Sequence, residues 1–219
     1  MKRMFPLPIG VLLASAAFAA AMTGPQVLQR IRAAYERVNT FQASFDQTFV
    51  WKLAGTRQQM RGQFLMKKPN RFRLQSEAQT VVTDGRTVWS YSPATKQVII
   101  NDYDPATMPL RPDNFLFQFP DERRARYVGA SLLDGARVHV VDIAPQDSSY
   151  GIRTMRVWVD DQTWVAKKVQ YLSVSLDTTT YVLQQVQLNP ALPDSVFKFT
   201  VPRGTEVVDF RSSRATRER

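Results

Sequence analysis

The sequence contains no cysteine, so neither a disulfide nor a Cys-ligated metal can hold the fold. Its single histidine, His139, lies between valines of an expected strand, which favours a structural role over general-base catalysis. The acid pairs at 121–122 and 160–161 fall in apparent turns without a third ligand. HExxH, G-x-S-x-G and phosphate-loop motifs are also absent. We therefore expect no catalytic residue, metal or cofactor, and a protein that is not an enzyme.

Long hydrophobic runs are absent beyond the N-terminus. Residues 1–21 combine the cations Lys2 and Arg3, an apolar run and small residues that offer A-x-A cleavage choices. This pattern predicts a secretory signal peptide rather than a membrane-spanning helix. Without cysteine no lipid can be attached after the signal. We expect a soluble periplasmic protein with one domain over residues 22–210.

Acidic residues are in the minority: 19 Asp and Glu face 29 Lys and Arg, giving a formal charge of +10. In an exported protein, basic charge suits anionic lipid headgroups or acidic partner surfaces better than nucleic acid. Solubility alone is an equally good explanation of most of these charges. Residues 211–219 predict a basic, flexible tail.

Most of the chain has the periodicity of β-strands. Residues 23–39 predict an amphipathic helix, with Thr23 as N-cap and Pro25 in the first turn. Short turns such as Asp84-Gly85 and Asp134-Gly135 then separate the strands, which predicts a large, curved antiparallel sheet. The expected strands are 41–53, 58–67, 71–76, 79–83, 87–92, 97–101, 125–132, 136–143, 153–160, 163–175, 178–188 and 206–210.

Residues 102–121 break this pattern of alternating strands and short turns, because they contain four prolines and no alternation of apolar residues. We expect a short helix or turn over 112–119 that acts as a lid at the mouth of the sheet. A second core helix that plugs the end of the sheet is the alternative. The lid residues would be Phe115, Leu116, Phe117 and Phe119.

One face of the sheet is expected to be apolar. In FQASFDQTFVWKL, residues 41–53, the large apolar side chains fall on odd positions. A curved sheet with one long helix encloses more room than that helix fills, which predicts an apolar cavity. The candidate cavity residues are Phe41, Phe45, Phe49, Trp51, Met60, Phe64, Met66, Phe72, Leu74, Trp89 and Tyr91.

Four blocks resemble the outer-membrane lipoprotein carrier family, the periplasmic chaperones called LolA. They are TFQASFDQTF, GQFLMKKPNRFRL, TDGRTVWSYSPATKQV and FKFTVPRGTEVVD, in this order. The resemblance implies an incomplete antiparallel β-barrel, closed by helices, whose apolar cavity holds the acyl chains of lipoproteins. It also implies two partners, an inner-membrane ATP-driven lipoprotein exporter and an outer-membrane lipoprotein receptor, and we expect a monomer.

The resemblance also assigns residues. The family's cavity phenylalanine after K-[KR]-P matches Phe72, and its first-strand aromatics match Phe41 and Phe45. Its lid-latching arginine corresponds to Lys68, which lacks the planar fork of arginine. Arg71 or Arg73 could replace the latch, or Lys68 could be an ordinary turn lysine.

Other functions remain open on the same half-barrel. One is a lipid or glycolipid shuttle. Another is a lipoprotein-sensing regulatory module that docks on a membrane-bound anti-sigma factor, whose family carries a second C-terminal domain.

Overall fold

The computed structural model describes residues 22–105, 124–144 and 151–211. The expected signal peptide, the lid segment 112–119 and most of the basic tail lie outside these residues. Within the described parts, no helix has both the length and the apolar character needed to cross a bilayer.

Helix α1 (Gly24–Glu36) confirms the predicted N-terminal helix. Thr23 and Gln26 form a reciprocal capping box, in which the Gln26 side chain accepts from the Thr23 N–H at 2.9 Å. The apolar stripe of the helix, which includes Val27 and Ile31, is buried against the sheet.

The strands agree closely with those predicted from the alternation of apolar residues and from the turns. They are β1 (Thr40–Trp51), β2 (Thr56–Lys67), β3 (Arg71–Ser76), β4 (Thr80–Thr83), β5 (Thr87–Ser92), β6 (Gln97–Asp102), β7 (Ala125–Leu133), β8 (Ala136–Ile143), β9 (Ile152–Asp160), β10 (Ala166–Ser173), β11 (Thr178–Leu188) and β12 (Glu206–Asp209). A 3-10 helix, η2 (Asp194–Phe197), precedes β12.

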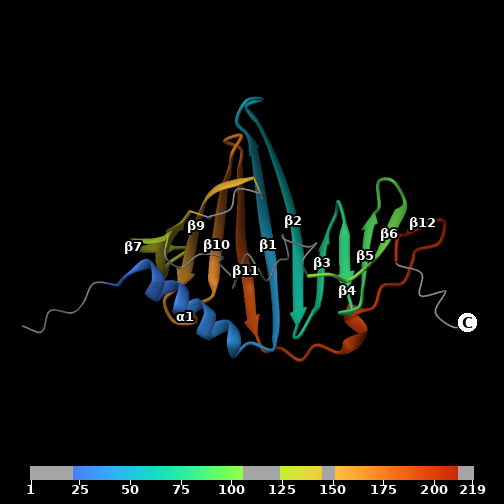
Figure 1. Cartoon of the computed structure of the whole chain (residues 1–219), viewed down its shortest axis with the longest axis horizontal. Helices are drawn as coiled ribbons and strands as arrows, with labels where there is room; N and C mark the ends of the chain where they lie inside the picture. The colour runs from blue at the N-terminus through green and yellow to red at the C-terminus, as the bar shows by residue number, and fades with distance from the viewer. Residues whose placement is uncertain (1–21, 106–123, 145–150, 212–219) are drawn as a thin grey trace, which may run out of the picture.

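All twelve strands form one open, curved sheet in the order β12-β6-β5-β4-β3-β2-β1-β11-β10-β9-β8-β7 (Figure 1). Two antiparallel meanders, β1–β6 and β7–β11, meet where β1 pairs with β11. Strand β12 adds to the edge of β6 in parallel, a pairing that the predicted meander did not anticipate. The fold is therefore an incomplete barrel with two free edges.

The two faces of the sheet carry separate apolar clusters. Directly paired residues share a face, so the register follows one face across all strands. The inner face continues from Phe72 on β3 through Met66 and Phe41 to Leu188 on β11. Helix α1 packs on β7 and β8 at the far end of this face, beside the β7–β10 half of the sheet in Figure 1. The candidate binding surface lies on the inner face of β1–β3.

Candidate binding face

Aromatic side chains form a continuous stripe on the inner face. The ring centroids of Phe64 lie 5.9 Å from Phe41 and 6.5 Å from Phe72, in tilted arrangements. Phe45 lies opposite Gly62, where a Cβ would sit 2.6 Å from its ring. Glycine at position 62 therefore leaves room for the Phe45 ring to lie across β2.

The structure brings most of the predicted cavity residues together. Five of them are at most 4% exposed, while Met60 and Leu74 are partly buried against the same cluster. The five are Phe41, Phe45, Phe64, Met66 and Phe72. Alternation grouped them correctly within each strand, and the register of β1–β3 places the groups on one face; their role in binding stays a prediction.

Phe49 and Trp51 continue this face toward the β1–β2 turn. Their rings meet edge to face with centroids 4.2 Å apart. Phe49 is half-buried and Trp51 is 37% exposed, so burial decreases along β1 toward its end.

Trp89 and Tyr91 do not lie on the inner face. Trp89 pairs with Val82, which pairs with Arg73, so all three share the face opposite to Phe72. Tyr91 contacts Phe199 there, with ring centroids 5.9 Å apart. The prediction was wrong because alternation identifies the two faces of a strand but not which one continues a neighbour's inner face. The turns decide that.

The outer cluster explains why these aromatics are present. It buries Val82, Val98 and Phe197, the last of which lies in η2 and is 0% exposed. The Arg73 guanidinium donates to the Val196 carbonyl at 3.3 Å, which fixes η2 against β3. Trp89 and Tyr91 therefore lie on the outer face, where the C-terminal segment packs.

Lys68, the candidate latch, contacts the end of α1. Its ammonium donates to the carbonyls of Tyr35 at 2.6 Å and Glu36 at 3.3 Å, and lies 4.1 Å from the centroid of the Tyr35 ring. Burial lowers the pKa of Lys68 below its usual value, and the nearby Glu36 charge opposes that shift. A cation at this position adds a charged donor to the last carbonyls of the helix, at the negative end of the helix dipole.

The proposed substitutes for Lys68 have other contacts. Arg71 forms an ion pair with Asp194 at 2.8 Å, and Arg73 holds η2. Phe115, Leu116, Phe117 and Phe119 lie outside the described residues, so a latch between Lys68 and a lid remains a prediction.

Sequence reasoning missed the contribution of the second meander. Tyr181 lies 6.1 Å from Phe45 and 6.3 Å from Tyr171, centroid to centroid. Burial raises the pKa of both tyrosine hydroxyls, and Tyr181 raises that of Tyr171 further. The alternation in 178–188 indicated a strand, but only the β1–β11 pairing places it beside the aromatic stripe.

His139 has the structural surroundings expected of it. It is 4% exposed, its Nε2 lies 2.6 Å from Asp161 Oδ1, and its Nδ1 lies 3.0 Å from the Tyr127 hydroxyl. Trp164 stacks on its ring with centroids 4.8 Å apart, and the Arg30 guanidinium of α1 lies 4.6 Å from the Trp164 ring centroid. This cluster connects α1 to β8 and to the turn between β9 and β10.

The acid pairs show no metal-binding arrangement among the described residues, where no group of three potential ligands occurs. Asp160 instead accepts from the backbone of Gln162 and Thr163 at 3.1 and 2.8 Å, as in a turn. The pair at 121–122 lies outside the described residues.

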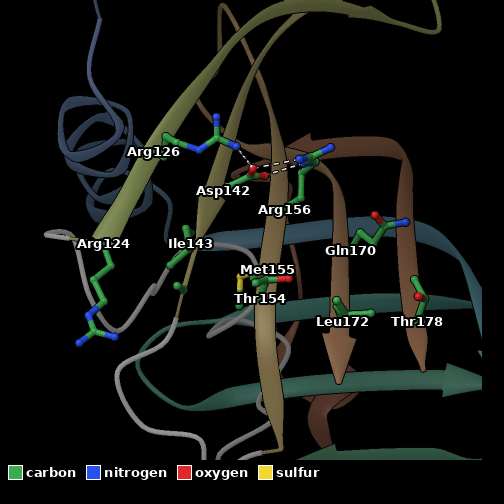
Figure 2. Close-up of a pocket in the computed structure, with 11 residues that line it drawn as sticks. Arg124, Arg126, Asp142, Ile143, Thr154, Met155, Arg156, Gln170, Leu172 and Thr178 are labelled. Carbon is green, nitrogen blue, oxygen red and sulfur yellow. Dashed lines mark hydrogen bonds and ion pairs between the residues drawn. The ribbon is translucent and has the colours of Figure 1, made fainter. Parts of the chain in front are cut away.

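A pocket of about 650 Å³, lined by both apolar and charged side chains, lies at the ends of β7–β11 (Figure 2). Asp142 is held there between Arg126, at 2.6 Å, and Arg156, at 2.5 Å. The hydrogen bond from Arg156 lowers the pKa of the Asp142 carboxyl, and the charges of both arginines add to this effect. These three side chains lie on the outer face, away from the aromatic stripe.

Known proteins resemble this chain over most of its length. Outer-membrane lipoprotein carrier proteins of Bordetella avium and Haemophilus ducreyi are 28% and 27% identical over 200 and 214 residues. These alignments cover 90% and 96% of this chain, and 93% and 98% of the relatives. An uncharacterized protein of Methanocaldococcus jannaschii is 23% identical over 193 residues and 85% of this chain, which spans only 54% of that relative.

A solved structure shares this fold. An uncharacterized conserved protein from Thermus thermophilus superposes with a TM-score of 0.58 at 13% identity, covering 84% of this chain and 97% of that one. The family model described as outer membrane lipoprotein carrier protein LolA matches residues 36–200, which include the aromatic stripe and Lys68. The chain belongs to the LolA family of outer-membrane lipoprotein carrier proteins.

Proposed function

We propose that this protein is a soluble periplasmic chaperone that binds the acyl chains of lipoproteins on its inner face and carries them from the inner to the outer membrane. The observation that supports this most directly is the aromatic stripe of β1–β3, which continues onto β11 across the open sheet. Family membership and the predicted signal peptide agree with it. An inner-membrane ATP-driven exporter would load the carrier, and an outer-membrane receptor would unload it.

Acyl chains need such a surface because each methylene removed from water contributes ~0.8 kcal/mol. A bilayer offers the same gain, so the carrier's preference for cargo over either membrane is small. Net direction therefore comes from the exporter's energy or from a better acceptor.

The aromatic stripe of the inner face is buried in this structure. Phe41, Phe64 and Phe72 are nearly inaccessible, and the pocket beside Phe72 has a volume of about 10 Å³, room for about one water molecule. Acyl chains would therefore have to displace covering side chains, and cargo would shift the protein from a closed to an open state. A closed empty state also avoids exposing a large apolar patch.

The test measures bound acylated polypeptide by native mass spectrometry after incubation with a triacylated lipoprotein. Phe72→Glu places a charge in the stripe, and we expect it to abolish retention of the cargo. Leu74→Glu is a second variant on the same face at a half-buried position, in case Phe72→Glu unfolds the protein. Gln75→Glu is the matched control, because Gln75 is exposed on the other face of β3.

Loss of cargo in folded Leu74→Glu with retention in Gln75→Glu supports the proposal. Recovery of free lipid alone from the wild-type protein favours a lipid shuttle and contradicts it. The proposal also fails if the wild-type protein retains no acylated polypeptide.

A further inference from the structure

Two neighbouring hairpin tips carry exposed apolar side chains. At the β1–β2 tip Leu53 is 95% and Trp51 37% exposed, and at the β10–β11 tip Val174 is 61% and Leu176 43% exposed. Large aliphatic side chains exposed to this degree lose favourable burial unless something covers them. In Figure 1 these two tips reach furthest from the rest of the sheet.

The two tips are held together as one structure. The Lys52 backbone N–H at the first tip donates to Asp177 Oδ1 at the second, at 2.9 Å. Asp177 also accepts from the Ser175 hydroxyl at 2.7 Å, and β1 pairs with β11 as far as Val50 and Thr178. The two tips that carry the four apolar side chains are therefore joined to each other and are not independent loops.

The tips continue the candidate binding face. Odd positions of β1 run from Phe41, which is 0% exposed, through half-buried Phe49 to Trp51 and then Leu53 beyond the strand end. This apolar track is interrupted at Gln47, whose paired neighbours are Met60 and Tyr181, and it reaches the first tip at Trp51.

Charges around the tips are mostly positive. Among the described residues, Lys52, Arg57 and Arg153 are exposed there, against the single carboxylate of Asp177. Arg153 follows Ile152, which pairs with Ser173 beside the second tip. Cations beside tryptophan and aliphatic side chains match the chemistry of an anionic membrane interface.

We propose that the paired tips, Trp51, Leu53, Val174 and Leu176, are a membrane-docking surface that inserts shallowly into a bilayer containing anionic lipids. Insertion would remove the exposed apolar side chains from water, while Lys52, Arg57 and Arg153 would meet the lipid headgroups. In a protein that carries acyl chains, the same contact would bring the end of the inner-face track to the bilayer. That last consequence rests on the proposed function, whereas membrane contact itself does not.

The experiment is flotation of the purified, cargo-free protein with vesicles of phosphatidylethanolamine, with and without phosphatidylglycerol. We expect the wild-type protein to float with phosphatidylglycerol-containing vesicles and to bind less at high salt. The double variant Leu53→Asp/Val174→Asp should bind at least about tenfold more weakly, because two exposed anchors are replaced by anions. Leu132→Asp is the control, since Leu132 is 74% exposed on the edge strand β7, level with the Ala166 end of β10 and so at the end of the strands away from the two tips.

Failure of the wild-type protein to float overturns the proposal. The proposal also fails if Leu132→Asp loses as much vesicle binding as the double variant. A concentration-dependent dimer that the double variant abolishes, without flotation of the wild-type protein, would assign the tips to contact between copies instead. Leu74→Glu should float normally even though it loses cargo. The carrier proposal and the membrane-docking proposal therefore fail with different results.

Discussion

Lys68 shows how one side chain connects two elements. It follows β2 in the chain, yet its ammonium binds the last carbonyls of α1 and lies over the Tyr35 ring. A lysine can do this because its three donors need no fixed plane, whereas a lid latch shared among several carbonyls would favour the arginine fork.

Lys68→Met should reduce the free energy of unfolding by ~1–2 kcal/mol, because it removes the charge and both hydrogen bonds but keeps most of the stem. Urea denaturation followed by circular dichroism measures the change. Lys68→Arg should keep most of the wild-type free energy of unfolding. Lys198→Met, at an exposed position, should have little effect on it. Equal stability of Lys68→Met and wild type would show that the contact with α1 contributes nothing.

At the scale of elements, the docking of α1 depends on close backbone contact. Gly24 is buried in the first turn, and a Cβ there would lie 2.1 Å from the Ala125 carbonyl oxygen at the start of β7. The sequence carries no sign of this requirement, because a glycine near a helix start is also a common capping choice.

Gly24→Ala should destabilise the protein by ~1–3 kcal/mol, because α1 must move away from β7 to relieve the overlap. Thermal unfolding would register the loss. Gln29→Ala changes an exposed position of the same helix and should be neutral or slightly stabilising. An unchanged melting temperature for Gly24→Ala would mean that α1 and β7 adjust freely.

The position of Trp89 is also decided between elements. Its strand and its alternation were predicted correctly, but the register through β4 puts it on the outer face with Val82 and Ile100. Each tight turn sets which side chains of the next strand point inward. The sequence alone does not show whether the odd or the even positions of that strand lie on the inner face.

At the scale of the molecule, ion pairs on the outer face contribute a pH-dependent stability. Asp142 joins Arg126 on β7 to Arg156 on β9, and its pKa is lowered chiefly by the hydrogen bond from Arg156. A carboxyl whose pKa is lower in the folded state stabilises the fold above its unfolded pKa, and this stabilisation is lost as pH falls through the folded pKa.

Asp142→Asn should therefore be less stable than wild type at pH 7, by ~1 kcal/mol after allowance for the partial exposure of both arginines. The difference in unfolding free energy between the wild type and Asp142→Asn should become smaller as pH falls below about 4, where the unfolded carboxyl begins to bind protons. Urea titrations at pH 7 and pH 3 test both statements. A gap that stays constant with pH would rule out the ion pairs as its source.

The sequence by itself determined the local structure of this protein. Alternation in 41–53 and in 178–188, together with tight turns such as Asp134-Gly135, determines strands and hairpins because period and turn chemistry are local properties. For the same reason, the apolar side chains within each of β1, β2 and β3 could be assigned to one face of their own strand.

Only the tertiary structure decided how these pieces combine. The pairing of β1 with β11 joins Phe45 to Tyr181, the parallel addition of β12 extends the free edge, and the turns place Trp89 outside. Partners distant in sequence leave no periodic signal in a single chain. Their pairing follows from the simultaneous burial of both meanders and α1, which is a property of the whole fold.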